Sequence, residues 1–179
     1  MDEHSAFLSS NHLRRPGELR SFAFAGVIGH ALRKRRRPLI HGLSNARFQK
    51  LLNEYFGDLD LSNGDGSAPS GDSEFNDLVK LLLDFRAVPS EELAWLSYAI
   101  ATAALGENHL WQDMGLADRQ MLTELMRENF PVLFARNSGN MKWKKFFYRQ
   151  LCERAEVPIC KSPHCADCSD YRVCFAPET

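Results

Sequence analysis

Most of the cysteines in this chain lie close together near its C-terminal end. Four of the five occur within 15 residues, with the spacing C-x4-C-x2-C-x5-C. The four residues are Cys160, Cys165, Cys168 and Cys174. Gaps this short let four thiolates converge on one metal centre if the backbone between them turns tightly, and Pro163, Asp167 and Ser169 suit such turns. The sequence therefore predicts a metal centre held by these four side chains.

Two kinds of metal centre fit four thiolate ligands. Structural zinc takes four thiolates in a closed site, but its ligands usually form two C-x2–4-C pairs with a longer spacer, and this sequence lacks that spacer. The first three cysteines instead have the C-x4-C-x2-C spacing of plant-type ferredoxins, although the fourth lies much closer than in those proteins. The spacing favours an iron–sulfur cluster and leaves structural zinc as the alternative.

The start of the chain bears on the state of these cysteines. Residues 1–4 are Met-Asp-Glu-His, without an apolar signal core, and no apolar run approaches the roughly 20 residues of a membrane-spanning helix. We therefore expect a cytoplasmic protein, and in a reducing cytosol clustered cysteines are more often metal ligands than disulfides. The net charge of −1 gives no strong attraction to nucleic acid or to a membrane surface.

The rest of the chain has the apolar periodicity of helices and no convincing alternating pattern of a strand. Hydrophobic residues make up 44% and charged residues 25%, which is ordinary for a globular protein with its own core. The expected helices run from Leu19 to Leu32, from Ser44 to Gly57, from Phe75 through Leu83, from Pro89 towards Gly106, from Asp118 to Asn129 and from Asn140 to Ala155. We predict an all-α fold, a helical bundle with an irregular cysteine-rich loop at its end.

Composition divides the chain into three parts. Residues 1–18 are polar and predict a flexible N-terminus, residues 19–157 predict a helical domain, and residues 158–179 form the metal-cluster loop. Within the helical domain, the stretch near 60–73 is rich in Gly, Ser and Asp, which predicts a mobile linker.

The helical domain also contains a possible internal repeat. In two places a helix is followed by a loop ending in Gly-Leu and a second helix ending in Phe, at Gly42-Leu43 with Phe56 and at Gly115-Leu116 with Phe130. The pattern is compatible with two related helical hairpins packed together. The alternative is that two amphipathic helix pairs align this well by chance.

Several blocks of sequence carry a family resemblance. They are residues 108–116 (NHLWQDMGL), 129–131 (NFP), 140–152 (NMKWKKFFYRQLC) and the cysteine loop through Cys174-Phe175. Together these blocks resemble the NifQ family, the molybdenum-delivery proteins of nitrogenase cofactor assembly. The resemblance is dense from about Trp95 to Glu178 and fainter from Leu19 to Phe56.

The resemblance implies an iron–sulfur protein that binds molybdenum and donates it for biosynthesis of the nitrogenase iron–molybdenum cofactor. It places the cluster on the four loop cysteines, each of which matches the family pattern. The implied partners are the nitrogenase cofactor scaffold, the nitrogenase iron protein and molybdate. The alternative function is a helical protein-interaction module with structural zinc on the same cysteines.

No motif of a hydrolase, a P-loop nucleotide-binding protein or a zinc protease is present in the sequence. We therefore expect a metal or cluster carrier and not an enzyme. Any redox change would belong to the cluster itself.

A basic helix face precedes the cysteine loop. Lys142, Lys145 and Arg149 fall at i, i+3 and i+7, with Lys144 beside them. One interpretation is a solvated face opposite the apolar side of the helix. The other is a basic patch that attracts molybdate or an acidic partner surface.

Three other side chains could bind metal, but a structural role fits each of them as well. Cys152 lies eight residues before the loop and is expected to be a buried structural cysteine. His109 is expected to cap or pack, with Glu107 and Asp113 as candidate hydrogen-bond partners. His164 adjoins a ligand cysteine, where it either faces water or binds molybdenum transiently.

Overall fold

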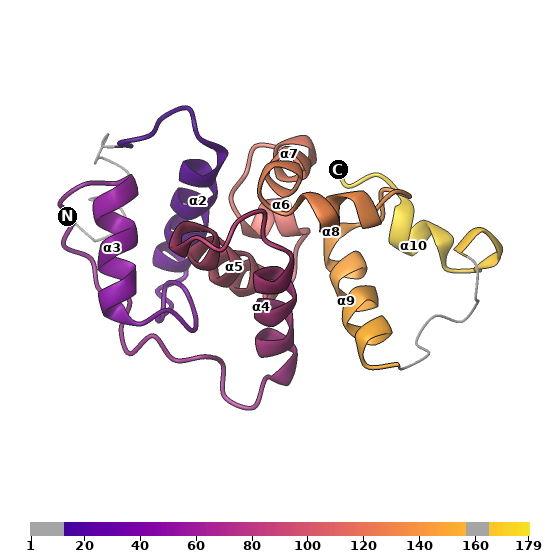
Figure 1. The fold of residues 1–179 in the computed structure, drawn as a ribbon, viewed down its shortest axis with the longest axis horizontal. Helices are drawn as coiled ribbons and strands as arrows, with labels where there is room; N and C mark the ends of the chain where they lie inside the picture. Colours follow the sequence, from indigo (N-terminus) through magenta and orange to yellow (C-terminus); the bar gives the residue numbers. More distant parts are fainter. Residues whose placement is uncertain (1–12, 157–164) are drawn as a thin grey trace.

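A computed structural model describes residues 13–156 and 165–179 of the chain, and every regular element in those ranges is a helix (Figure 1). In chain order they are α2 (Leu19–Arg33), α3 (Asn45–Tyr55), α4 (Ser73–Phe85), α5 (Glu91–Ala104), α6 (Leu110–Asp113), α7 (Arg119–Asn129), α8 (Pro131–Arg136), α9 (Trp143–Arg154), the 3-10 turn η1 (Cys165–Asp167) and α10 (Tyr171–Phe175). The prediction of an all-α fold is confirmed.

Part of the sequence analysis concerns residues outside these ranges. The expected flexible N-terminus falls mostly on residues 1–12, and Cys160 and His164 fall in 157–164. Within the described ranges, no helix has the length and apolar character needed to cross a membrane.

Short polar side chains fix where α3, α4, α5 and α7 begin. The capping oxygens belong to Ser44, Asp72, Ser90 and Asp118, and each accepts a hydrogen bond from a backbone N–H three residues further on. Each cap satisfies an N–H group that has no partner within its own helix. Helix starts at or beside Ser44, Ser90 and Asp118 are predicted from the sequence, and the structure places them there.

Several elements differ from the sequence prediction: α6, α8, the start of α9, and α10, a short helix in the stretch predicted to be an irregular cysteine-rich loop. The sequence indicates Pro131 only as a residue beyond a helix end, but it is the first residue of α8, where its missing N–H costs no hydrogen bond. α6 is a single turn, too short for apolar periodicity to reveal it. α9 begins at Trp143 and not at Asn140, which has a positive φ of 55° and lies outside the helix.

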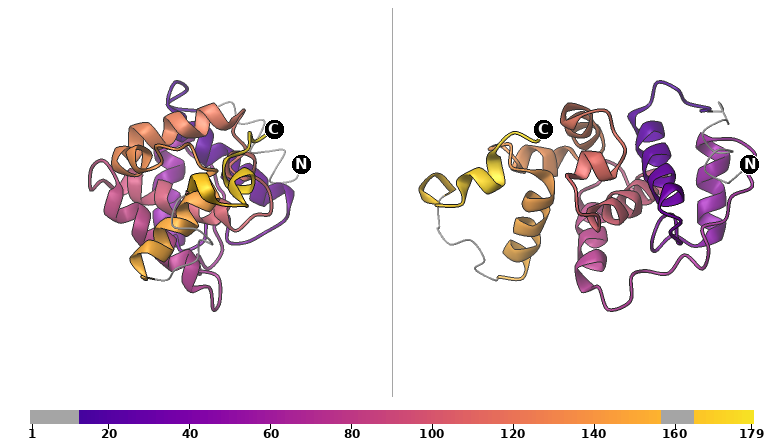
Figure 2. Two further views of the ribbon diagram at one scale, coloured as in Figure 1. Left: turned by 90° about the vertical axis from the view of Figure 1, so that its right-hand side faces the viewer. Right: turned by 180° about the vertical axis from the view of Figure 1, so that it is seen from behind.

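The helices from α2 to α9 share one hydrophobic core in which α5 is central. α5 packs against α2, α4 and α6, and α9 packs against α4. Figure 1 and the right-hand view of Figure 2 show an elongated arrangement, with α3 at one end and α9 and α10 at the other. The segment that carries the cysteines therefore lies at the end of the molecule opposite the N-terminal helices.

α2 and the loop after α6 touch backbone to backbone at two glycines. A Cβ atom on Gly26 would overlap the carbonyl oxygen of Met114, and one on Gly115 would lie 2.8 Å from the Cα of Gly26. Gly115 also has a φ of 64°, in the left-handed region that favours glycine. The contact leaves no room for a side chain and holds the segment after α6 against α2.

The segment near 60–73 is attached to the loop between α2 and α3. Asn63 is fully buried, and its Oδ1 accepts a hydrogen bond from the N–H of Ile40 at 2.8 Å. Its Nδ2 donates to the carbonyl oxygens of Ile40 at 2.8 Å and Leu43 at 2.5 Å. The Gly- and Ser-rich composition predicts a mobile linker and does not reveal this anchor, because the anchor depends on carbonyl groups 20 or more residues away.

The two units of the possible repeat share local geometry. In both, a glycine with positive φ precedes a buried leucine, at Gly42-Leu43 and Gly115-Leu116. In both, the second helix is followed by a buried phenylalanine at its C-cap, Phe56 and Phe130. This agrees with two related hairpins, and chance alignment remains the alternative.

The glycine contact predicts whether one substitution raises or lowers the free energy of unfolding. Alanine normally stabilises a helix interior by roughly 0.5–1 kcal/mol over glycine. Gly26→Ala should instead lower the free energy of unfolding by about 1–3 kcal/mol, because the methyl group collides with the Met114 backbone. Urea unfolding measures the change.

Gly17→Ala is the matched control, since no atom lies within 4 Å of the position its Cβ would take. That variant should unfold at nearly the same urea concentration as the original chain. A Gly26→Ala protein as stable as the original, or more so, would contradict the backbone contact.

Candidate metal centre

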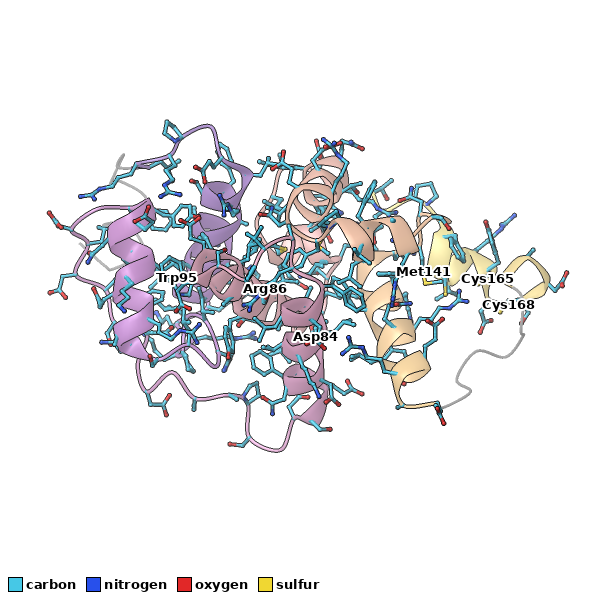
Figure 3. The ribbon with its side chains drawn as sticks, in the orientation of Figure 1. Asp84, Arg86, Trp95, Met141, Cys165 and Cys168 are labelled. Carbon is cyan, nitrogen blue, oxygen red and sulfur yellow. The ribbon has the colours of Figure 1, made fainter. Side chains whose placement is uncertain are left out.

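Three of the four predicted ligands lie in the described part of the chain. Cys165 begins η1, Cys168 follows η1 directly, and Cys174 lies within α10. Each is neither fully buried nor fully exposed. Figure 3 shows Cys165 and Cys168 on the C-terminal segment, beyond α9. The fourth, Cys160, lies outside the described residues.

The backbone between these cysteines turns tightly, as their spacing predicts. The N–H of Cys168 donates to the carbonyl oxygen of Cys165 at 3.1 Å, and the N–H of Tyr171 donates to that of Cys168 at 3.1 Å. The rings of Tyr171 and Phe175 stack with their centroids 4.5 Å apart. Backbone hydrogen bonds and ring stacking over a short range thus shape this segment.

The last cysteine of the loop is attached to the segment before α9. The N–H of Lys142 donates to the carbonyl oxygen of Cys174 at 2.7 Å. The ring of Phe175 covers Gly139 so closely that a Cβ atom there would lie 3.1 Å from it. α10 therefore has a fixed position next to the start of α9.

The tail after α10 is held by a buried carboxylate. The Glu178 side chain is 3% exposed, with an oxygen 3.4 Å from Nδ1 of His109 and another 3.5 Å from Nε of Arg119. Arg119 also donates from Nη2 to the carbonyl oxygen of Met141 at 2.9 Å. His109 thus has a packing role, but its carboxylate partner is Glu178 and not the expected Glu107 or Asp113. Sequence reasoning missed Glu178, which no local pattern marks.

A buried ion pair connects α9 to α6. Nζ of Lys144 lies 2.6 Å from a carboxylate oxygen of Asp113 and donates to the carbonyl oxygen of Gly106 at 2.7 Å. The Asp113 side chain is 2% exposed and also accepts hydrogen bonds from the N–H and the side-chain amide of Asn108. A Cβ atom on Gly106 would overlap this carboxylate. Lys144 is therefore a structural residue and not part of a basic surface.

The basic face expected on α9 separates into different environments. Lys145 is exposed and Lys142 partly exposed, whereas the Arg149 side chain contacts the cysteine loop. Arg149 donates from Nη1 to the sulfur of Cys165 at 2.9 Å and from Nε to Glu153 at 3.0 Å. Burial lowers the pKa of the Arg149 guanidinium, but the bonds to Glu153 and Cys165 outweigh it and leave the pKa raised. Arg149 is a permanent cation beside a predicted ligand sulfur.

A cavity of about 500 Å³ lies between α8, α9 and the cysteine loop. Its polar lining includes Arg136, Arg149, Gln150, Glu153 and Cys165. Figure 3 labels Met141 and Cys165, which line it from the segment before α9 and from η1.

The donor chemistry of the loop fits a thiolate-bound metal. Soft sulfur ligands select iron–sulfur clusters and zinc. Among residues 13–156 and 165–179, no three Cys, His, Asp or Glu side chains are gathered closely enough to hold a metal ion. Metal binding displaces thiol protons and brings the ligands together, so the conformation of the cysteine loop is coupled to metal binding. The four cysteines remain the predicted ligands.

Cys152 differs from its prediction. It lies on α9 and is half-buried, whereas the sequence predicts a buried structural cysteine. A partly exposed thiol outside the loop is a useful internal comparison for the loop cysteines.

The fold and the site define a class: an all-α protein whose C-terminal cysteine segment is fastened to its last long helix. A family model described as NifQ matches residues 23–176. Curated relatives include Protein NifQ of Azotobacter vinelandii, 46% identical over 59% of this chain and 54% of the relative. Protein NifQ of Rhodobacter capsulatus is 36% identical over 76% of each chain, and that of Klebsiella pneumoniae is 50% identical over 45% of this chain and 48% of the relative.

The chain belongs to the NifQ family. Membership implies a role in nitrogen fixation. The aligned region spans about half the length of the Azotobacter and Klebsiella relatives, 54% and 48%. No solved structure matches the chain.

The buried ion pair predicts the effect of removing its cation. Lys144→Met should lower the free energy of unfolding by about 2–3 kcal/mol, because it leaves the Asp113 carboxylate buried without a cation. Chemical denaturation measures the loss. The double variant Lys144→Met with Asp113→Asn should recover part of the lost stability, because the unpaired charge is then gone.

Lys145→Met is the matched control, since Lys145 is the exposed neighbour on the same helix. It should change stability by less than about 0.5 kcal/mol. Equal losses from both lysines would show that the ion pair does not hold α9 in place.

Proposed function

We propose that this chain is an iron–sulfur protein that binds molybdenum and donates it for biosynthesis of the nitrogenase iron–molybdenum cofactor. The observation that carries the proposal is the NifQ family match over residues 23–176, a range that includes the whole four-cysteine loop. We further propose that it is a carrier and not an enzyme, and that it works in the cytoplasm.

The residues that would hold the cluster are Cys160, Cys165, Cys168 and Cys174. Thiolates with sulfide bind iron, and the same soft donors also suit reduced molybdenum. Arg149 supports this role, because its N–H bond to the Cys165 sulfur orients the side chain. Molybdenum is cargo in this scheme and arrives as molybdate.

The position of the loop supports delivery to a partner. The cysteine segment lies at one end of the elongated molecule, with its described cysteines partly exposed (Figure 2). A carrier has to release its metal, and partly exposed ligands at the end of a molecule are accessible to an accepting protein. The proposed partners are the nitrogenase cofactor scaffold and the nitrogenase iron protein.

Substitution of one ligand tests the proposal. Cys168→Ala should lose nearly all bound iron, because a cluster held by four thiolates cannot keep its geometry on three. Most helicity should remain, since no contact of the Cys168 thiol with the helical core contributes to packing. The measurements are iron, molybdenum and zinc content, the visible spectrum and circular dichroism, on protein purified without oxygen from cells supplied with molybdate.

Cys152→Ala is the matched control, because this cysteine is partly exposed on α9 outside the loop, and it should keep its iron. The original chain should contain iron with sulfide-to-iron charge transfer absorption, and molybdenum. About one zinc per chain without colour would overturn the carrier proposal and favour a structural zinc module.

A further inference from the structure

The cavity between α8, α9 and the cysteine loop has the composition of an anion site. We propose that it binds a tetrahedral oxyanion, held by the guanidinium groups of Arg136 and Arg149 next to the Cys165 sulfur. Its volume of about 500 Å³ accommodates such an anion together with water. The choice of molybdate as the natural anion rests on the proposed function, whereas the site itself rests on the lining of the cavity.

Arg136 supplies a positive charge that no carboxylate in the described residues neutralises. Its Nη1 donates to the side-chain oxygen of Gln150 at 3.2 Å, and its guanidinium lies 4.3 Å from the ring centroid of Phe85. An aromatic face and an amide hold the guanidinium in place but leave its net charge uncompensated. Arg136 is therefore orientated and still able to pair with an anion.

Arg149 supplies the second guanidinium and links the cavity to the loop. Its Nε pairs with Glu153 and its Nη1 contacts the Cys165 sulfur, while Nη2 has no hydrogen-bond partner among the described residues. Arginine presents several N–H groups in a plane, so one guanidinium can bind sulfur and oxyanion together. An anion in this cavity would lie beside a predicted cluster ligand.

The charges of the lining favour an anion. Arg136 and Arg149 face one carboxylate, that of Glu153, which is already paired with Arg149. Ser138 adds a hydroxyl group. Lys142 and Lys145, grouped with Arg149 by the sequence pattern, do not line the cavity. The basic residues therefore do not act as one continuous face. Two arginines from different helices line a single cavity instead.

Equilibrium dialysis against sodium molybdate, with molybdenum measured by elemental analysis, tests the site. It uses the full-length chain, once as purified without oxygen and once after iron has been removed with a chelator. Both forms should bind molybdate saturably, because the arginines act without the cluster. Arg136→Gln and Arg149→Gln should each weaken binding about tenfold, the loss of one charge-assisted contact.

Lys145→Gln is the charge-matched control on the exposed side of α9, and its affinity should stay within about twofold of the original, as expected for a solvent-exposed charge. Sulfate and phosphate added as competitors distinguish a molybdate-selective site from a general oxyanion site, and either result keeps an oxyanion there. No saturable binding by the original chain, or unchanged affinity in Arg136→Gln, would overturn the proposal.

The iron content of each sample separates this inference from the proposed function. Arg136 is held by Gln150 and Phe85, neither of which is a predicted ligand, so Arg136→Gln should lose molybdate affinity and keep its metal content. A zinc-containing chain whose molybdate binding depends on Arg136 would refute the carrier function but keep the oxyanion site. An iron-containing chain whose molybdate binding does not depend on Arg136 would refute only the proposed oxyanion site.

Discussion

The buried carboxylate of Asp113 fixes where the last long helix lies. A carboxylate with 2% exposure is costly to bury unless it is paired and hydrogen-bonded, and here Lys144 and Asn108 supply the partners. Lys144 reaches it from α9 and also binds the carbonyl oxygen of Gly106. The Asp113 carboxylate, which lies in α6, therefore determines the position of α9. In turn, α9 carries Arg149, which contacts the cysteine loop.

Besides the bond from Arg149 to the Cys165 sulfur, contacts that do not involve sulfur fasten the loop. Backbone bonding joins Cys174 to Lys142, and aromatic packing places Phe175 on Gly139. Beyond α10, the buried Glu178 lies between His109 and Arg119. These contacts use main-chain groups, a ring and a carboxylate, and they hold the loop in its place on the helical domain.

Position and charge work together at this end of the molecule. Partly exposed cysteines suit the proposed carrier, which has to pass its metal to another protein, and the nearby arginines favour oxyanions over neutral species. Arg149 takes part in both effects, since it contacts the Cys165 sulfur and lines the adjoining cavity.

The sequence by itself determined the helical class, most helix starts and the identity of the predicted ligands. These depend on local chemistry: apolar periodicity, capping side chains such as Ser44, Ser90 and Asp118, and the cysteine spacing. The sequence did not predict one-turn helices such as α6, because they are too short to show apolar periodicity.

Only the tertiary structure decided the partners of charged side chains. The sequence pattern placed Lys144 beside the basic face of Lys142, Lys145 and Arg149, yet Lys144 pairs with Asp113, 31 residues away, and Arg149 contacts Cys165. Glu178 and His109 meet across most of the C-terminal half of the chain. Such pairs form because folding brings distant segments together and buries their charges. Spacing along one helix cannot show which distant side chain becomes the partner of a given charge.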